Sequence, residues 1–272
     1  MRLTEKERKQ LERNNKWWQD RHIESQNRLA NKSVIVTEKQ LQKYYKKTIK
    51  KVIADFEATY DKLLATMEDG RQPTPADLYK LDKYWQMQAQ LKTQLQRLGD
   101  NEIELLTRNF AQTYQQAYEM LALPSDRAFS TIDDALAQEM IQHVWCADGK
   151  TWSARVWENT EKLAETLNDE LISCVVGGKK TTDLKNLLIE RFNVSYSAAD
   201  ALVRTEIAHI QTQAAQKRYK DYGIDKVQVW ADKDERQCDL CGKLHKKIYN
   251  VGDKMPIPAH PNCRCCIVPV VE

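Results

Sequence analysis

The run LQKYYKKTIKKVIADFEATYDKLLATM, residues 41–67, contains the pattern that decides the fold. Its large apolar side chains follow one another every three or four residues, at Leu41, Tyr45, Ile49, Ile53, Phe56, Tyr60, Leu63 and Met67. This spacing gathers them on one face of an α-helix, because 3.6 residues complete one turn. The pattern therefore predicts a long amphipathic helix, which we expect to end at Gly70.

The segment that follows continues the helical pattern. Thr74 and Pro75 have the residue types of an N-cap and a first helical position, and the helix that they open is predicted to end at Gly99. A further amphipathic helix is predicted after that glycine and is stopped by Pro124. We therefore expect an N-terminal region of long helices over residues 1–123.

Shorter helices are predicted for the central part of the chain, residues 124–225. Ser130 is a candidate N-cap for a helix that ends near Trp145. Ser153 is a candidate N-cap for a helix that ends at the Gly177-Gly178 pair.

Two more helices complete this central region. One is predicted over about 182–192. Ser197 and Asp200 have the spacing of a capping box, which predicts the start of a separate helix that ends at Gly223.

The periodicity changes to two in the C-terminal segment, residues 226–272. Residues 226–230 alternate polar and apolar side chains like a half-buried strand, and residues 247–249 are a weaker candidate. Residues 267–271 are predicted as an edge strand, because Pro269 cannot donate to a central ladder. The segment is expected to form a small β and loop module.

Composition supports a folded and mainly helical protein. The 272 residues include only 8 Gly and 7 Pro, and 42% of residues are hydrophobic, which favours long helices with a buried core. No apolar stretch approaches the ~18 residues of a membrane span, so we expect no membrane association and a location in the cytoplasm of the cell that makes the protein.

Charge is concentrated at the N-terminus. The net charge of the whole chain is +3, which excludes a histone-like polycation. Residues 1–51, the basic arm, hold 15 Lys and Arg against 6 Asp and Glu, a net charge of +9. Such an arm can contact DNA through its phosphates, or an acidic protein surface, or solvent alone.

Five of the seven cysteines lie within residues 238–266, and their spacing indicates a metal site. Cys238 and Cys241 form a C-x2-C pair, and 18 residues separate them from His260, Cys263 and Cys265. Two thiolates on one turn and a second pair from a distant loop can complete a tetrahedral zinc site. Five candidates compete for four positions, so the spacing leaves the ligand set open.

The zinc ion is expected to be structural, with one ion per chain. Four protein ligands leave no position for a catalytic water, and a small module gains folding energy from the metal. A zinc deaminase joins an H-x-E motif to a P-C-x-x-C motif; here His22 and Glu24 lie far away in a charged segment, and Gln237 precedes Cys238. The predicted fold is therefore mainly α, with an N-terminal long-helix region, a central helical domain and a small zinc-stabilised β and loop module (α+β).

Several runs of this sequence resemble phage minor head proteins of the Mu F-like and SPP1 head-morphogenesis family. The runs are YSAADALVRTE at 196–206, YGI at 222–224, WADKDERQCDLCG at 230–242 and HPNCRC at 260–265, with WSARVWENT at 152–160 as a weaker match. The sequence departs from the family pattern at Ala259, where a second proline is expected, and at Cys266, which is an additional thiol.

The resemblance implies a minor capsid protein of a phage or prophage. Such a protein associates with the portal during procapsid assembly, lies inside the head near the portal vertex, and influences DNA packaging or ejection. The implied partner is the portal protein, and the scaffold or major capsid protein is a further candidate. The charge of the basic arm separately makes DNA a candidate partner. The resemblance implies no enzymatic activity, and ADP-ribosyltransferase domains fused to some relatives are not expected here. A zinc-containing nucleic-acid-binding protein outside any virion is the alternative.

Overall fold

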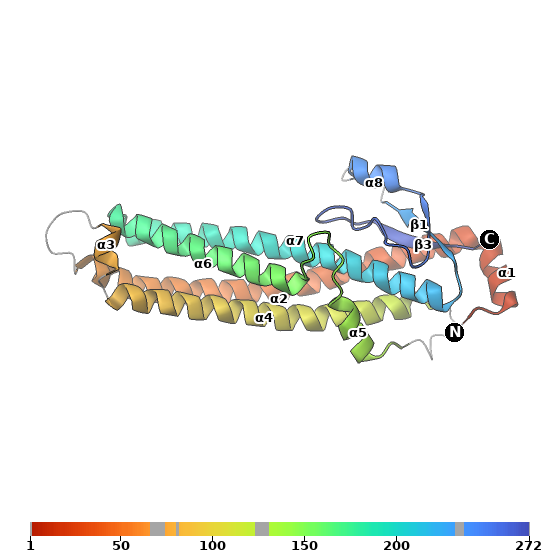
Figure 1. Cartoon of the computed structure of the whole chain (residues 1–272), viewed down its shortest axis with the longest axis horizontal. Helices are drawn as coiled ribbons and strands as arrows, with labels where there is room; N and C mark the ends of the chain where they lie inside the picture. Colours follow the sequence, from red (N-terminus) through yellow and green to blue (C-terminus); the bar gives the residue numbers. More distant parts are fainter. Residues whose placement is uncertain (1, 66–73, 80–81, 123–130, 232–236, 272) are drawn as a thin grey trace. The chain divides into compact units, whose positions relative to one another are not determined.

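The computed structural model describes residues 2–65, 74–79, 82–122, 131–231 and 237–271 (Figure 1). It is mainly helical and has a small C-terminal antiparallel sheet, which confirms the predicted fold class. In chain order, the elements are α1 (Glu5–Arg13), α2 (Asn15–Ala65), α3 (Pro75–Leu78), α4 (Asp82–Met120), α5 (Asp134–Ile141), α6 (Trp152–Val176), α7 (Thr181–Asp221), β1 (Lys226–Trp230), α8 (Asp239–Leu244), β2 (Ile248–Asn250) and β3 (Cys266–Val270).

The chain forms two compact units, and each combines segments that are distant in the sequence. The first unit contains Met1–Glu38, Leu106–Thr151 and Ala201–Glu272. The second unit contains Lys39–Leu105 and Trp152–Asp200. The helices α2, α4 and α7 therefore contribute residues to both units.

The apolar face predicted for residues 41–67 lies in the second unit and is largely confirmed up to Tyr60, while the side chains of Leu63 and Met67 lie outside the described part of the chain. Leu41, Tyr45, Phe56 and Tyr60 are buried. Val52 is buried in place of the predicted Ile49 and Ile53, which are half-buried. Val52 lies seven residues after Tyr45 and four before Phe56, so it stays on the buried face while its neighbours flank that face. The predicted helix end at Gly70 lies outside the described residues.

A polar network crosses the core of the second unit. The Tyr45 hydroxyl donates to Glu102 Oε2 at 3.3 Å, lies 3.3 Å from Ser195 Oγ, and accepts from Asn159 Nδ2 at 3.2 Å. The Glu102 side chain is fully buried, and burial raises the pKa of this carboxyl to about 7. The Glu102 carboxyl group is therefore protonated in much of the population near neutral pH.

The prediction that Gly99 ends a helix is wrong, because α4 continues through this residue to Met120. A Cβ atom at Gly99 would lie 2.6 Å from Cζ3 of Trp157 and 3.0 Å from its Cη2. Glycine is thus required here for the close approach of an aromatic ring from α6, and not for helix termination.

The short helices of the central region differ in part from the prediction. The N-cap of α5 is Asp133, whose side chain accepts from the Ala135 amide, while Ser130 lies outside the described residues. This helix ends at Ile141, four residues before Trp145, near which its end was predicted. The predicted stop of α6 is confirmed, because Val176 is followed by the glycine pair and Gly178 adopts a φ of +59°.

The predicted capping box at Ser197 is also wrong, because α7 runs without interruption from Thr181 to Asp221. The Ser197 hydroxyl donates to the Asn193 carbonyl at 2.9 Å, one turn earlier in the same helix. A serine within a helix commonly bonds back to the preceding turn in this way, so its presence did not mark a helix start.

All three predicted strands are confirmed and form a sheet with the order β2-β1-β3. Both pairings are antiparallel, with Val227 of β1 opposite Tyr249 of β2 and Pro269 of β3. The proline lies on an edge strand, as expected for a residue without an amide proton. Side chains from α2 cover this edge, because Gln19 donates to the Pro269 carbonyl at 3.0 Å and Gln26 to the Ile267 carbonyl at 2.9 Å.

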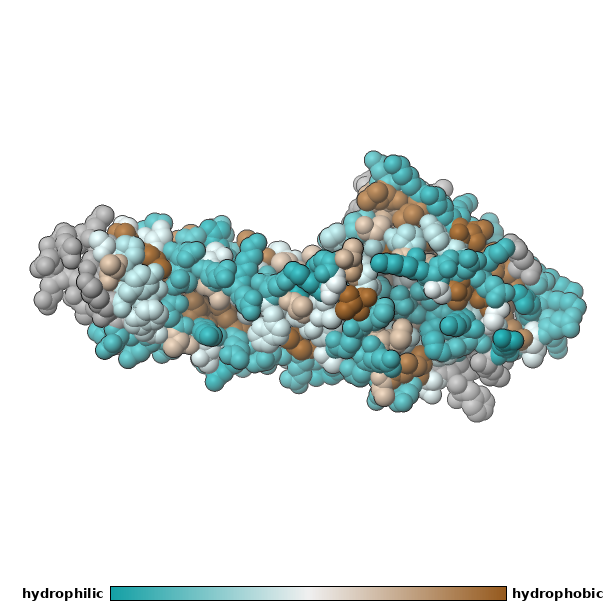
Figure 2. Space-filling view, viewed as in Figure 1, coloured by the Kyte–Doolittle hydropathy of each residue, from teal (hydrophilic) through white to brown (hydrophobic). Residues whose placement is uncertain are grey.

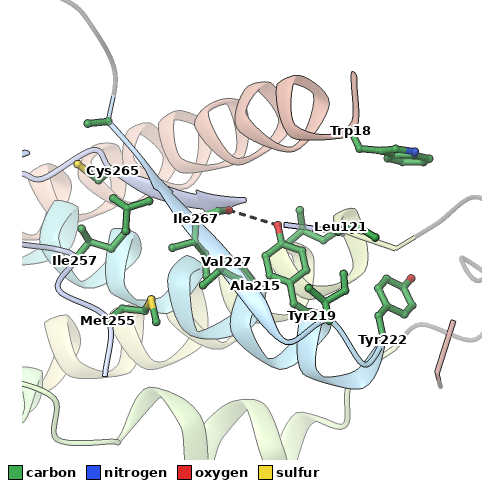
Figure 3. Close-up of a cluster of buried hydrophobic side chains, with 14 of the residues drawn as sticks. Trp18, Leu121, Ala215, Tyr219, Tyr222, Val227, Met255, Ile257, Cys265 and Ile267 are labelled. Atoms are coloured by element: carbon green, nitrogen blue, oxygen red, sulfur yellow. Dashed lines mark hydrogen bonds between the residues drawn. The ribbon is translucent and has the colours of Figure 1, made fainter. Parts of the chain in front are cut away.

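The core of the first unit gathers side chains from α2, α7, the sheet and residues 260–265, the cysteine-rich loop (Figure 3). Tyr219 is fully buried at its centre and donates to the Ile267 carbonyl at 3.4 Å. His22 stacks on Tyr219 with its Nδ1 3.0 Å from the phenol oxygen. Trp18 is buried in the same cluster and Cys265 belongs to it, so the core extends up to the cysteine-rich loop.

The face of the described chain seen in Figure 2 is mainly hydrophilic, with scattered apolar side chains. One apolar patch lies at α8, the helix that carries the exposed Leu240. Within the described residues, none of the helices has the length and apolar character needed to cross a bilayer.

Candidate metal centre

The first half of the centre is built on the first turn of α8. Cys238 is the N-cap of this helix, with φ −83° and ψ 162°, and its Sγ accepts from the Cys241 amide at 3.4 Å. The C-x2-C spacing therefore places one thiol at the cap and the other one turn later. Both sulfurs thus lie at the same end of the helix.

The second half is a turn that α7 holds in place. The Cys263 amide donates to the His260 carbonyl at 3.2 Å, and Asn262 adopts a left-handed φ of 62°. The Asn262 amide donates to Thr205 Oγ1 of α7 at 3.1 Å. This link from α7 to the cysteine-rich turn could not be predicted, because no local sequence signal connects two residues that lie 57 positions apart.

His260 presents one ring nitrogen to the thiols. Its Nδ1 lies 2.7 Å from the Pro261 carbonyl, which can only accept, so the proton of the neutral ring resides on Nδ1. The unprotonated Nε2 then lies 3.2 Å from Cys241 Sγ. Metal-binding histidines commonly donate their second ring N–H to a carbonyl, and this arrangement has that form.

The structure brings all five predicted donors together. Cys238, Cys241 and His260 form one group and Cys241, Cys263 and Cys265 another, with the ligand atoms of each group within 4.8 Å of one another. Cys241 is shared by both groups. The sulfurs of Cys241 and Cys263 lie 3.7 Å apart, close to the ~3.8 Å edge of a tetrahedron with zinc–sulfur bonds of ~2.3 Å. This Cys/His cluster could bind a metal ion.

The thiols of the cluster differ in acidity. The Cys241 amide lowers the pKa of Cys238, and a hydrogen bond from Cys265 lowers the pKa of Cys263 to about 5. Burial raises the pKa of Cys241 to about 12, and the Cys263 thiolate raises that of Cys265 further. The hydrogen bond to Pro261 raises the pKa of His260. Each half of the centre therefore contributes one readily ionised thiol.

Other candidate donors have different roles. Cys266 is buried in β3 opposite Trp230 and belongs to neither donor group. The His245 ring accepts from the Ala231 amide through Nδ1 at 3.2 Å, which fixes the C-terminal end of α8. His22 of the H-x-E motif stacks on Tyr219 in the core and is likewise in neither group.

Other side chains near Thr205 on α7 contact other parts of the first unit. Arg204 pairs with Glu38 of α2, and its side chain is 43% exposed. The Glu206 carboxylate accepts from Trp145 Nε1 at 3.1 Å, and His209 stacks on the same indole at 4.3 Å. Trp145 thus fixes the loop after α5 against α7.

Comparisons with known proteins agree with these observations. Residues 165–268 match the family described as Phage Mu protein F like protein. The chain is also similar to NAD(+)--arginine ADP-ribosyltransferase EFV of Enterococcus faecalis, with 26% identity over 165 residues that cover 51% of this chain and 34% of that protein. The chain therefore spans about a third of the length of this curated relative.

No solved structure matches the chain. The family match contains α7, the sheet strands β1 and β2, and every donor of the Cys/His cluster. Residues 165–268 of this chain are therefore a Phage Mu protein F-like domain.

Proposed function

We propose that this chain is a minor head protein of a phage or prophage, which associates with the portal during procapsid assembly and influences DNA packaging or ejection. The Cys/His cluster supports this proposal most, because all of its donors lie within the Mu F-like domain. The proposed location is the interior of the phage head near the portal vertex, reached from the host cytoplasm during assembly.

We propose a single structural zinc ion, held by Cys241 and three of Cys238, His260, Cys263 and Cys265. Zinc coordinated by four protein ligands supplies folding energy and leaves no position for a reacting water. The ion would join the first turn of α8 to the turn that Thr205 anchors on α7. The proposed role is therefore to close the C-terminal module into a rigid docking surface.

Metal analysis of the purified chain tests this role. The wild type, purified under reducing conditions without chelator, is expected to carry about one zinc per chain. Cys241→Ser removes the donor shared by both groups and should reduce bound zinc to near zero. Cys266→Ser is the matched control. The buried Cys266 thiol lies outside both donor groups, so this variant should retain the ion. A metal-free wild type, or a Cys241→Ser variant that keeps its zinc, would contradict the proposal.

Association with the portal can be tested by co-expression with the portal protein encoded nearby. The wild-type chain and Cys266→Ser are expected to sediment with portal rings, and Cys241→Ser is expected to lose this association. If the folded wild-type chain never sediments with the portal, the minor head assignment is wrong, whereas the zinc measurement stands by itself.

A run of lysines on α2 supports contact with packaged DNA. Six exposed lysines and no acidic residue lie within residues 39–51, and none has an ion-pair partner among the described residues. Each lysine that neutralises a phosphate releases a counterion and adds ~0.9 to the salt slope of the binding constant. We expect that Lys39, Lys43, Lys46 and Lys50 changed together to Gln reduce this slope by ~3.6 units.

The control for the DNA contact uses four exposed lysines elsewhere in the second unit, Lys92, Lys162, Lys179 and Lys180. Their change to Gln should leave most of the slope in place. If both quadruple variants lose the same slope, the basic arm carries no defined DNA contact. DNA binding with no portal association would instead favour the alternative function, a zinc-containing nucleic-acid-binding protein outside a virion.

We propose that the chain itself has no ADP-ribosyltransferase activity. Glu-x-Glu pairs, the acidic pattern of interest for such transferases, occur at Glu5 and Glu7 and at Glu102 and Glu104. Glu7 completes the capping box of α1 with Thr4, and Glu102 is buried in the core of the second unit. Incubation with labelled NAD⁺ and an arginine acceptor should transfer no label. Transfer that one acidic substitution abolishes without unfolding would overturn this proposal.

A further inference from the structure

A pocket of about 430 Å³ lies within the first unit, away from the donor groups of the Cys/His cluster. One wall is a polar face of α7 that runs from His209 to Lys220. The other walls are the loop after α5, with Val144 and Trp145, and the loop after β2, from Val251 to Ile257. The volume is in the range of pockets that enclose a small ligand or a few peptide side chains.

The pocket is held open by specific contacts. Gln216 of α7 donates to the Asp253 carbonyl at 2.9 Å, which fixes the loop after β2. Trp145 bonds to Glu206 and stacks on His209, which fixes the loop after α5. The walls are therefore pre-formed and do not depend on a bound partner.

Part of the lining is apolar and adaptable. Met140, Val144, Met255 and Ile257 line the pocket, and Val144 is 41% exposed. Methionine side chains are flexible and adjust to varied apolar shapes. An apolar side chain of a partner would remove this surface from water.

The charged side chains of the lining have a net positive charge, because Lys217, Lys220 and Lys254 outnumber Asp253. Lys217 is neutralised by Asp221, with both oxygens at 2.6 Å. Lys220 and Lys254 are exposed and have no ion-pair partner in the part of the chain that the structure describes. The carboxylate of Asp253 is occupied by the backbone and side-chain amides of Asn250. The pocket therefore has two free cations at its edge.

The pocket also contains unused hydrogen-bonding capacity. His209 is only 6% exposed, and its Nε2 has no hydrogen-bond partner among the residues that the structure describes. Burial lowers the pKa of His209 to about 3, so the ring is neutral at physiological pH and can serve as donor and acceptor. Polar groups left unpaired in a buried position favour a ligand that can satisfy them.

We propose that this pocket binds a short acidic segment of another protein, with an apolar side chain between Val144 and Met255 and carboxylates paired with Lys220 and Lys254. The charge of the rim selects an acidic partner, and the apolar lining selects a segment that combines acids with a large apolar residue. This binding site is additional to the proposed zinc-dependent docking surface.

The test uses the full chain and 15-residue fluorescent peptides that cover all proteins encoded by the neighbouring genes. Fluorescence anisotropy is expected to identify at least one binder that combines acidic and apolar residues. The double variant Lys220→Glu/Lys254→Glu should weaken this binding at least tenfold, because two attractive charge pairs become repulsive. Lys243→Glu/Lys247→Glu is the matched control, since these exposed lysines lie in the same unit outside the pocket and should leave affinity nearly unchanged.

Each of the following outcomes would overturn the proposal. No acidic peptide binds, or the best binders are indifferent to Lys220→Glu/Lys254→Glu, or both double variants weaken binding equally, which indicates general charge attraction only. Inorganic phosphate and acetate are titrated in parallel, and an ion that binds the pocket while no peptide does would also replace the proposed occupant. Portal sedimentation of the intact chain is a separate measurement, so either proposal can fail alone.

Discussion

The substitution Gly99→Ala tests whether the ring of Trp157 determines the residue at the centre of α4. In an ordinary helix interior, alanine stabilises by ~1 kcal/mol relative to glycine. Here the new Cβ would lie 2.6 Å from the ring, against the ~3.5 Å of a normal carbon contact, so the indole must move by ~1 Å. Overpacking of this kind costs ~1–3 kcal/mol. The net expectation is therefore no gain, or a loss of up to ~2 kcal/mol.

A double-mutant cycle with Trp157→Leu separates the two effects. Without the indole, Gly99→Ala should stabilise the chain by the full ~1 kcal/mol of helix propensity. Urea unfolding followed by far-ultraviolet circular dichroism gives the free energy of unfolding for the four proteins. A stabilising Gly99→Ala in the otherwise wild-type chain would refute the close approach as the reason for this glycine.

Two further predictions concern buried ionisable groups. Burial raises the pKa of Glu102 from 4.5 to about 7, so the folded state holds this proton more tightly than the unfolded state, and the free energy of unfolding should fall by ~3 kcal/mol as pH rises from 4.5 to 7. Urea titrations at pH 5 and 8 should show that Glu102→Gln removes this pH dependence. An unchanged pH dependence in the variant would assign it to other groups. The buried Arg218 lies 3.5 Å above the Tyr118 ring and donates to the Tyr118 carbonyl at 2.9 Å. Arg218→Met keeps the aliphatic stem but should lower the free energy of unfolding by ~1–3 kcal/mol, because that carbonyl loses its partner. An equal loss in the control Arg97→Met, at an exposed arginine of α4, would show that the effect is not specific to the buried site.

Local patterns predicted the helices, the strands and the metal donors, because each depends on spacing within a short segment. The three-to-four spacing identified the face that contains Leu41 and Phe56, and the alternation in residues 226–230 identified β1. Likewise, the C-x2-C spacing corresponds to one turn at the start of α8.

The errors had two causes: one residue type responds to a distant partner, and another fits both an N-cap and a helix interior. Gly99 was assigned to a helix end, whereas Trp157 from another helix requires the space beside it. Ser197 was assigned to an N-cap, whereas its hydroxyl bonds within a continuous helix. The anchoring of the cysteine-rich turn by Thr205 has no sequence signature, because it depends on tertiary contact alone.

The core of the first unit unites Leu11 and Trp18 with Ile267 and Val271, which the chain separates by about 250 residues. During synthesis on the ribosome, Leu11 and Trp18 therefore cannot be fully buried until β3 has emerged. For the same reason, we expect residues 165–268 to fold poorly as an isolated fragment. This fragment would lack Leu11, Trp18 and Leu121, and the core side chains that they cover would be exposed to water.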